Sequence, residues 1–425
     1  MIGAAILVVF AAMLVRSVRR PGVAMALLLL FFSGKQLVQV SIPLFAERGP
    51  LVNYLVFGPL GLIWIHRALR GRAERMLGIP REYAMHLLFF ALAALSTMWC
   101  LNPGVWYFAG KLAPYIAVYA LLVPSLLAST QGISEAYQWI AWVGGAMCIV
   151  FLSGYSESAG IDRLVLEAEM ETGGTLGLNP LAVGAMGAWT VVTATLGEFP
   201  KHRIVFVLRL VVAAAGLVVA ARSSRGDLFA ALIAVGFFGP IPTSTAKGLQ
   251  GRRLAAALAA IVVGGAVLYY GLFLTDYWSR YDNASVDGGV LVRQEMIGEV
   301  LDYYIRHPST WLFGSGWSSS FALFGFYPHN GLAQALGELG LVGAALWVSS
   351  VVYVFTRGLR LALLASRTGS RSLDVMRPAL ALMLCALISN MKAGDCVDIW
   401  LALTLSTASQ LIRRFRPESE KSLLR

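Results

Sequence analysis

The sequence predicts an all-α membrane protein that crosses the bilayer about a dozen times. Of its 425 residues, 58% are hydrophobic and only 13% are charged, whereas about a quarter of the residues in soluble domains are charged. The charges also gather between long apolar runs, which is how membrane proteins distribute them. Too few charged side chains remain to cover the surface of a soluble domain of this length.

Apolar runs of roughly 17–25 residues mark the predicted spans. We interpret the first run as a span and not as a signal peptide, because no basic residue precedes it and its first arginine, Arg16, follows it. The chain is then one transmembrane domain, 1–425, with 12 or 13 spans. Thirteen candidates lie near residues 1–15, 22–40, 51–66, 83–100, 112–128, 137–153, 180–196, 204–221, 227–241, 254–274, 329–355, 378–394 and 398–412.

The basic residues predict which side of a bacterial inner membrane each loop faces. Alternate loops, beginning with the loop after residues 1–15, contain 23 of the 34 Lys and Arg residues, and the opposite loops contain ten. Because basic loops stay in the cytoplasm, the C-terminus is expected inside and, with thirteen spans, the N-terminus outside. The net charge of +11 then reflects topology and contact with anionic lipid, and no nucleic-acid partner is expected.

Two long loops are predicted on the periplasmic side, over residues 154–179 and 275–328. Within the second loop, residues 290–305 have helical periodicity, with apolar and charged stripes, and His307-Pro308 follows them. We expect an amphipathic helix that lies on the membrane surface or over a cavity. The aromatic, glycine-rich segment 311–317 that follows is either an interfacial anchor or a lid that contacts sugar.

Neither a metal site nor a cofactor is predicted. The four cysteines have no metal-ligand spacing, and no acidic or histidine-rich metal motif is visible on the periplasmic side. Cys100 and Cys396 both fall near periplasmic ends of predicted spans, so a disulfide between them stays open as an alternative to two free thiols.

The first candidate site begins where the chain re-enters the membrane after the second long loop. His329 follows Pro328 at the mouth of a predicted span, and Gln334 and Glu338 share one face of that helix. A carboxyl group inside a span faces the bundle interior or a water-filled cavity. A histidine at this position either accepts a proton from a hydroxyl group or is an interfacial cap, and Glu338 is either functional or a structural hydrogen-bond partner.

A second candidate joins two spans through a very short turn, Arg222-Ser-Ser-Arg225-Gly-Asp227. The basic-loop count assigns this turn to the periplasmic side, where arginine is disfavoured. Either an arginine pairs with Asp227, or Arg222 and Arg225 bind an anion, since the guanidinium fork matches phosphate oxygens. Arg293, early in the amphipathic helix, is a third candidate for the same role. Alternatively, Arg293 forms a salt bridge to a nearby acid, or Arg280 in the same loop takes this role.

These motifs resemble the family of O-antigen ligases and polymerases. The similarity lies in His329-Asn-Gly-Leu…Gln334…Glu338-Leu-Gly, in Ser224-Arg-Gly, in the stretch from Arg293 to Gly314-Ser-Gly316, and in Gly177-Leu-Asn-Pro180. The matching pattern covers roughly residues 170–350, and its most specific element begins at His329. Family members commonly have an even number of spans with both ends inside, which differs from a count of thirteen.

The resemblance implies a GT-C-like, metal-independent, inverting glycosyltransferase. Such enzymes move a glycan from a polyprenyl (undecaprenyl) diphosphate carrier to an acceptor sugar at the periplasmic face. Carried over to this chain, Arg222 or Arg225 and Arg293 would bind the diphosphate. His329 would orient or deprotonate the acceptor hydroxyl group, and Glu338 would support the helix or the histidine.

Three functions stay open from the sequence. A polymerase of O-antigen or exopolysaccharide is slightly favoured over a ligase that transfers glycan to lipid A-core in lipopolysaccharide synthesis, and other polysaccharide-assembly proteins are possible partners of either. A transporter or flippase of lipid-linked sugar would have polar sites along many spans and paired repeats. This chain has no evident repeat, and its polar residues concentrate at the periplasmic ends of the spans.

Overall fold

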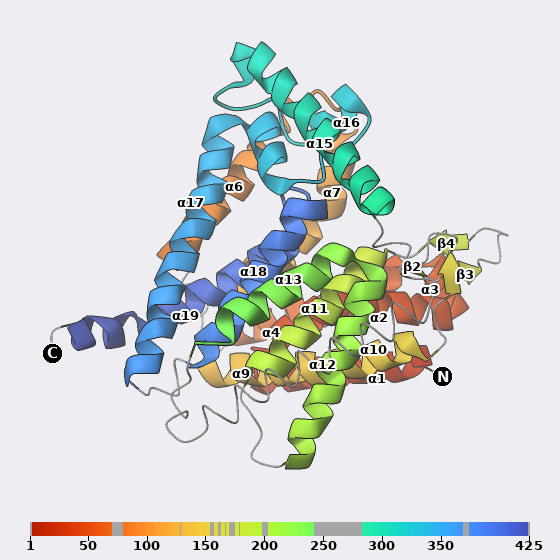
Figure 1. Cartoon of the computed structure of the whole chain (residues 1–425), viewed down its shortest axis with the longest axis vertical. Coiled ribbons are helices and arrows are strands. Elements are labelled where there is room, and N and C mark those ends of the chain that lie inside the picture. Colours follow the sequence, from red (N-terminus) through yellow and green to blue (C-terminus); the bar gives the residue numbers. More distant parts are fainter. Residues whose placement is uncertain are drawn as a thin grey trace. The chain divides into compact units, whose positions relative to one another are not determined.

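The protein is a multi-pass membrane protein made almost wholly of helices (Figure 1). Among the described residues, six helices are long and apolar enough to cross a membrane. They are Ile2–Arg19, Val23–Ser41, Val105–Leu126, Thr130–Leu152, Ile204–Ser223 and Gly331–Leu364. The computed structural model describes residues 2–69, 80–127, 129–153, 157–159, 163–165, 167–169, 175–177, 179–197, 203–241, 283–368 and 374–423.

Every predicted span within the described residues coincides with a helix or a run of consecutive helices. The predicted span 254–274 lies outside the described residues, so the count of thirteen stays a prediction. The chain divides into two compact units, each built from three separate segments. Unit 1 contains Met1–Gly78, Ser125–Arg280 and Ala362–Cys385, and unit 2 contains Ile79–Pro124, Tyr281–Leu361 and Ala386–Arg425. The single transmembrane domain stays a prediction.

Unit 1 is built around two helices that are buried on all sides, α2 (Val23–Ser41) and α11 (Pro180–Leu196). A helix that is apolar all round belongs in the interior of a bundle. The other helices of the unit are α1 (Ile2–Arg19), α3 (Pro43–Glu47), α4 (Pro50–Arg67), α9 (Thr130–Trp139), η3 (Ile140–Gly144), α10 (Gly145–Leu152), α12 (Arg203–Ser223) and α13 (Arg225–Phe238), with the start of α18 (Met376–Ala393).

Glycines bring the backbones of α11 and α12 close together. A Cβ atom on Gly187 would lie 2.6 Å from the carbonyl oxygen of Gly216, and one on Gly216 would lie 2.8 Å from the carbonyl oxygen of Gly187. Small residues of this kind allow close helix packing in membranes, where no hydrophobic effect drives helices together. By contrast α1 lies at the surface of unit 1: Val8 is 68% and Val15 72% exposed, as expected of a helix that faces lipid.

Polar contacts join several helix ends within unit 1. Arg377 donates hydrogen bonds of 3.0 Å to the carbonyl oxygens of Leu196 and Ile241, at the ends of α11 and α13. Arginine satisfies helix C-termini in this way. Arg16 at the end of α1 pairs with Glu135 near the start of α9.

The first long loop contains four short strands where the sequence predicted only a loop. They form two antiparallel pairs: β1 (Glu157–Ala159) with β2 (Arg163–Val165), and β3 (Glu167–Glu169) with β4 (Thr175–Gly177). Each strand has three residues, so these pairs are local hairpins within the loop and the protein keeps its helical class.

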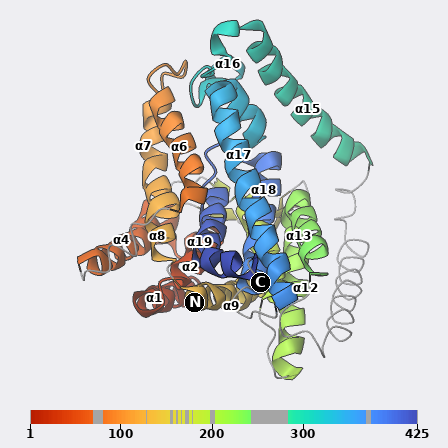
Figure 2. The same ribbon diagram turned by 90° about the vertical axis from the view of Figure 1, so that its left-hand side faces the viewer.

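Unit 2 contains the described part of the second long loop, residues 283–328, where the helix predicted at 290–305 is present as α15 (Asn283–Arg306). Its helices are α6 (Arg81–Ser96), α7 (Val105–Ile116), η2 (Ala117–Leu122), α15 (Asn283–Arg306), η6 (Pro308–Thr310), α16 (Ser319–Phe324), α17 (Gly331–Thr368) as far as Leu361, the end of α18, and α19 (Ile399–Leu423). The helix α15 ends just before His307-Pro308, as the sequence indicated. Figure 2 shows the end of α15 beside the start of α17, with the rest of α15 pointing away.

The apolar stripe of α15 is buried only toward its C-terminal end. Val300 is 2% exposed, whereas Val292 is 49% exposed. A Cβ atom on Gly337 of α17 would lie 2.5 Å from the Val300 side chain, so this part of α15 packs directly on α17. The amphipathic helix is thus anchored at one end and presents apolar side chains along the other.

Candidate functional site

The long helix α17 is interrupted at Gly340, which has φ 68° and ψ −168°. This backbone region is accessible in practice only to glycine. The interruption removes helical hydrogen bonds, and residues 311–316, here called the 311–316 turn, replace them. The turn donates two hydrogen bonds to α17, from Gly316 N to Glu338 O (2.8 Å) and from Ser315 N to Gly337 O (3.2 Å). It accepts two from α17, at Trp311 O from Leu341 N (2.8 Å) and at Leu312 O from Val342 N (3.2 Å).

Two glycines let the 311–316 turn approach α17 this closely. A Cβ atom on Gly314, which has φ 70°, would overlap the carbonyl group of Glu338, and one on Gly340 would overlap that of Leu312. The turn therefore seals the break in α17 with its backbone. Its Trp311, Leu312 and Phe313 side chains stay about half exposed, as the anchor interpretation requires.

Glu338 is fully buried beside this break and accepts three hydrogen bonds. Its Oε2 accepts from Ser318 N (2.8 Å) and from Gln334 Nε2 (2.9 Å), and its Oε1 accepts from Ser320 N (3.0 Å). The predicted shared face of Gln334 and Glu338 is thus confirmed. Because the carboxylate has no exposed surface and binds the start of α16, its geometry suits a positioning role and not contact with a substrate.

The hydrogen bonds around Glu338 continue toward His329. Ser318, held by Glu338, has its Oγ 3.2 Å from the hydroxyl oxygen of Tyr327. Phe321 of α16 also stacks on the Tyr327 ring, at 5.5 Å between centroids, and burial raises the pKa of this tyrosine. Tyr327 precedes His329 by only two residues, so the buried carboxylate fixes the segment that presents the histidine.

His329 lies at the start of α17, as predicted, with its side chain exposed and its φ at 50°. This left-handed conformation is uncommon for residues other than glycine and marks strained functional sites. The next residue holds it there: Asn330 Oδ1 accepts from Ala333 N (2.9 Å), and Asn330 Nδ2 donates to Met391 O (3.0 Å). Within the described part of the chain, nothing hydrogen-bonds to the exposed imidazole ring.

Asp395 completes this framework, and it was not among the site residues predicted from the sequence. Its Oδ1 accepts from Val397 N (3.0 Å) and from Trp317 Nε1 (3.4 Å), and its carbonyl oxygen accepts from Asn390 Nδ2 (2.7 Å). Burial raises the pKa of this carboxyl group. The available signal was an acidic residue in the short connection between two apolar helices, a placement that usually has a structural or functional reason.

The cysteine alternative is settled in favour of free thiols, and no Cys100–Cys396 disulfide forms. The Cys100 thiol donates to the carbonyl oxygen of Trp317 (2.8 Å) and lies 3.3 Å from Ser319 Oγ. Cys396 is buried, and its backbone N–H donates to Gln334 Oε1 (3.0 Å). Each cysteine therefore joins the same polar framework separately.

The arginine turn of unit 1 has the very short form that the sequence predicted. Helix α12 ends at Ser223 and α13 begins at Arg225, and the Ser224 hydroxyl caps α13 by accepting from Asp227 N (3.4 Å). A Cβ atom on Gly184 of α11 would lie 2.7 Å from Ser224 Cβ and 2.8 Å from Asp227 Oδ2. The turn is thus fixed against α11, and both Arg222 and Arg225 are half-buried beside it.

The predicted site residues fall into two groups. Arg222 and Arg225 belong to unit 1, and Arg293, His329 and Glu338 belong to unit 2. Within unit 2, hydrogen bonds link Glu338 to the segment that carries His329, while Arg293 lies half-buried on α15. Arg280 lies outside the described residues.

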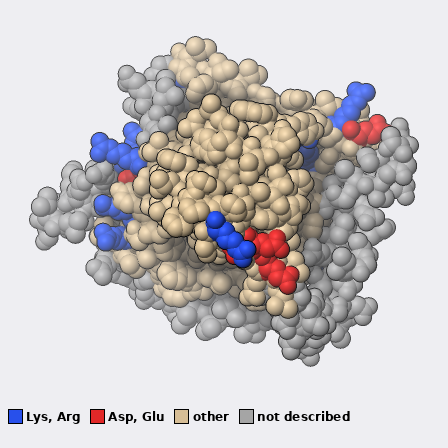
Figure 3. Space-filling model, turned by 90° about the horizontal axis from the view of Figure 1, so that it is seen from above, with Lys and Arg blue, Asp and Glu red and all other residues tan. Residues whose placement is uncertain are grey.

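Uncharged side chains predominate among the described residues on the face shown in Figure 3, and charged ones lie in a few separate groups. Within the described ranges, no three His, Cys, Asp or Glu side chains lie together where they could hold a metal ion. The chain matches no protein-family model, and no curated protein matches it.

The contacts of Glu338 lead to a prediction about stability. In a Glu338→Gln variant the amide keeps one acceptor oxygen and turns its NH₂ group toward a backbone N–H, so at most two of the three hydrogen bonds survive. We expect unfolding in detergent to become easier by about 2 kcal/mol, the usual cost of an unsatisfied buried polar group. Glu299→Gln, the same change at an exposed position of α15, serves as the control. Equal unfolding midpoints for the two variants would contradict the assigned contacts.

Proposed function

We propose that this protein is a membrane glycosyltransferase of the O-antigen ligase and polymerase type. It would take a glycan from a polyprenyl diphosphate carrier and transfer it to an acceptor sugar at the periplasmic face of a bacterial inner membrane. The observation that carries the proposal is His329: an exposed histidine at the start of a membrane helix, held in a left-handed conformation by Asn330 and by the framework around Glu338.

In this proposal the acceptor hydroxyl oxygen attacks the anomeric carbon while the bond to the diphosphate oxygen breaks. His329 accepts the hydroxyl proton, so the nucleophile gains negative character as the new glycosidic bond forms. Arg222 or Arg225 and Arg293 are the candidates to bind the diphosphate and to stabilise its developing charge. The reaction inverts the anomeric centre. It needs no metal ion, because the arginines offset the charge that develops on the diphosphate.

A transporter of lipid-linked sugar is the alternative from another class, and the break in α17 bears on it. Transporters use broken helices whose freed backbone groups bind ions or substrate. Here the 311–316 turn occupies the carbonyl oxygens of Gly337 and Glu338 and the N–H groups of Leu341 and Val342. The break therefore offers little backbone for a ligand, which favours the enzyme.

Product analysis in a deletion strain tests the proposal. Restoring the wild-type gene should restore surface polysaccharide, whereas His329→Ala and Arg225→Ala should not, although both proteins reach the membrane in normal amounts. Full-length lipid-linked polymer in the deletion strain would identify a ligase, and single repeat units on the acceptor would identify a polymerase. Normal polysaccharide from both variants would exclude the proposed mechanism.

A further inference from the structure

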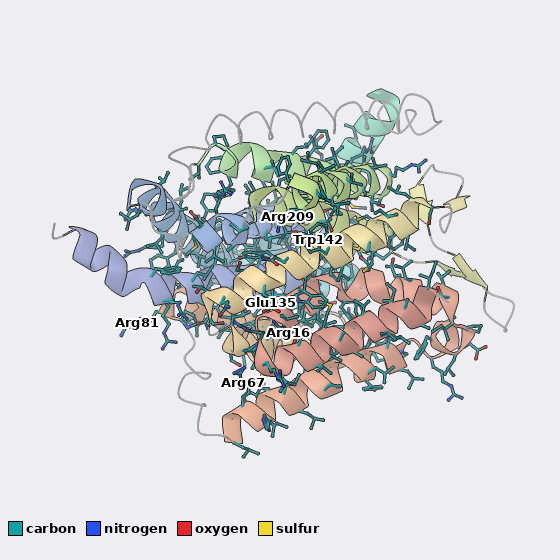
Figure 4. All side chains as sticks on the ribbon, turned by 90° about the horizontal axis from the view of Figure 1, so that it is seen from below. Arg16, Arg67, Arg81, Glu135, Trp142 and Arg209 are labelled. Atoms are coloured by element: carbon teal, nitrogen blue, oxygen red, sulfur yellow. The ribbon has the colours of Figure 1, made fainter. Side chains whose placement is uncertain are left out.

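A cavity of about 530 Å³ opens in unit 1 between the end of α1 and the start of α9 and η3. In Figure 4, Arg16 and Glu135 lie close together on these neighbouring helices, and Trp142 lies farther along toward α12. The lining of the cavity combines basic, acidic, amide and aromatic side chains. The residues are Arg16, Arg20, Gln131, Ser134, Glu135, Gln138, Trp139, Trp142 and Val143. None of them belongs to the proposed catalytic groups.

Glu135 holds both arginines at the mouth of this cavity. Its carboxylate lies 2.5 Å from Nε of Arg16 and 3.7 Å from Nε of Arg20. Only the Nε atoms take part in these pairs, and among the described residues no acceptor binds the terminal guanidinium nitrogens. The two guanidinium groups are thus oriented by one carboxylate while their four terminal NH₂ groups stay available as donors, and the local net charge is positive.

The amide and hydroxyl side chains of the cavity are also without partners in the described part of the chain. Gln131, Ser134 and Gln138 follow one another at intervals of three or four residues, so they lie on one face of α9 together with Glu135. Neither amide group nor the hydroxyl group hydrogen-bonds to a described residue. A ligand with several acceptor oxygens would satisfy these donors and the arginines together.

The cavity changes from polar to aromatic along the helix. The polar residues of the cavity lie within the first turns of α9. Trp142 and Val143 lie on η3, about 10–12 Å along the helix axis from Glu135 at 1.5 Å per residue. Tryptophan is typical of the interface between headgroups and acyl chains. This order fits an amphiphile and does not fit a small soluble anion.

We propose that this cavity binds the phosphate-bearing headgroup of a membrane phospholipid. Arg16 and Arg20 bind the phosphodiester oxygens, the α9 amides bind the polar headgroup, and Trp139 and Trp142 contact the glycerol and the first acyl carbons. The basic loop after α1 is one of those that the sequence assigns to the cytoplasm, where the leaflet carries anionic lipid. The site is separate from the proposed reaction and does not depend on it.

Lipid binding to the purified full-length protein in detergent tests this site. Native mass spectrometry with phosphatidylglycerol should show at least about tenfold weaker binding to an Arg16→Gln/Arg20→Gln double variant than to the wild type, since two charge-assisted hydrogen-bond donors are lost. Arg19→Gln, an exposed neighbour that does not line the cavity, should bind like the wild type. Because the double variant also breaks the pairs with Glu135, Gln131→Glu provides a second variant that leaves them intact and repels phosphate.

Two further ligands distinguish the sources of the phosphate. Diacylglycerol with the same acyl chains should bind at least tenfold more weakly than phosphatidylglycerol, and millimolar inorganic phosphate should not displace the lipid. Equal lipid binding by wild type, the double variant and Gln131→Glu would overturn the proposal, as would equal binding of diacylglycerol. Displacement of the lipid by inorganic phosphate alone would assign the cavity to a soluble anion and would also overturn it.

Discussion

Replacing Gly340 by alanine is expected to lower the stability of unit 2 by at least about 3 kcal/mol, more than most single substitutions do. The φ and ψ angles of Gly340 fall where only glycine is readily accommodated. In addition, an alanine Cβ would overlap the carbonyl group of Leu312, which belongs to the turn that seals the break in α17. Relieving the overlap would move the 311–316 turn and break the hydrogen bonds it makes to α17.

Gly325→Ala is the matched control for this effect. Gly325 also has a positive φ, of 76°, but no atom lies within 4 Å of the place its Cβ would take. The Gly325→Ala substitution should therefore lower the stability only by the backbone strain, about 1–2 kcal/mol. Unfolding of both variants in detergent, followed by tryptophan fluorescence, gives the comparison. Similar losses for the two variants would show that the close contact between the turn and α17 is not formed.

The largest effect on activity is expected at His329, where loss of the imidazole should reduce glycan transfer to background. A His329→Ala variant removes the proposed proton acceptor but keeps a Cβ atom in the left-handed conformation. A His329→Gly variant removes the same group and also relieves the strain, which should make it more stable than the alanine variant by about 1 kcal/mol. Both variants should be inactive in spite of this difference.

This pair of variants separates a chemical role from a structural one. If His329 acted only by shaping the start of α17, the more stable glycine variant would recover activity. His329→Asn adds a further control, because asparagine tolerates the left-handed region but does not accept a proton near neutral pH. Transfer by the asparagine or glycine variant at more than a few per cent of the wild-type rate would contradict the proposed role.

The sequence was sufficient for the predicted spans within the described residues and for the local contact between Gln334 and Glu338, because both depend on short-range periodicity. It also indicated the end of α15 at His307-Pro308 and the short turn before Arg225. These features follow from apolar spacing and from the conformational limits of proline and of capping residues. They involve residues that are near one another along the chain.

The seal of the α17 break was not predictable in the same way. Gly314 and Gly340 are separated along the chain, and each glycine alone is compatible with many backbone conformations. The role of Asp395 was missed for a similar reason, since its partner Trp317 lies far away in sequence. The structure gives Glu338 a definite environment where the sequence left a functional and a structural interpretation open.

The framework around Glu338 explains how the fold can present a strained histidine. Hydrogen bonds run from Glu338 to Ser318 and from Ser318 to Tyr327, while Asn330 fixes the other side of His329. Strain of this kind persists only where the surroundings determine the conformation from several directions. In this account the buried carboxylate and the glycine contacts are the means by which the exposed imidazole is held in place.

The most direct test of the proposed reaction is release of polyprenyl diphosphate from a glycan-loaded carrier by the purified protein in lipid vesicles with an acceptor glycan. We expect wild-type protein to release the carrier in step with formation of the new glycosidic bond, and His329→Ala protein, equally well folded, to release none above background. Equal release by the two proteins, or movement of the intact loaded carrier across the membrane without release, would contradict it.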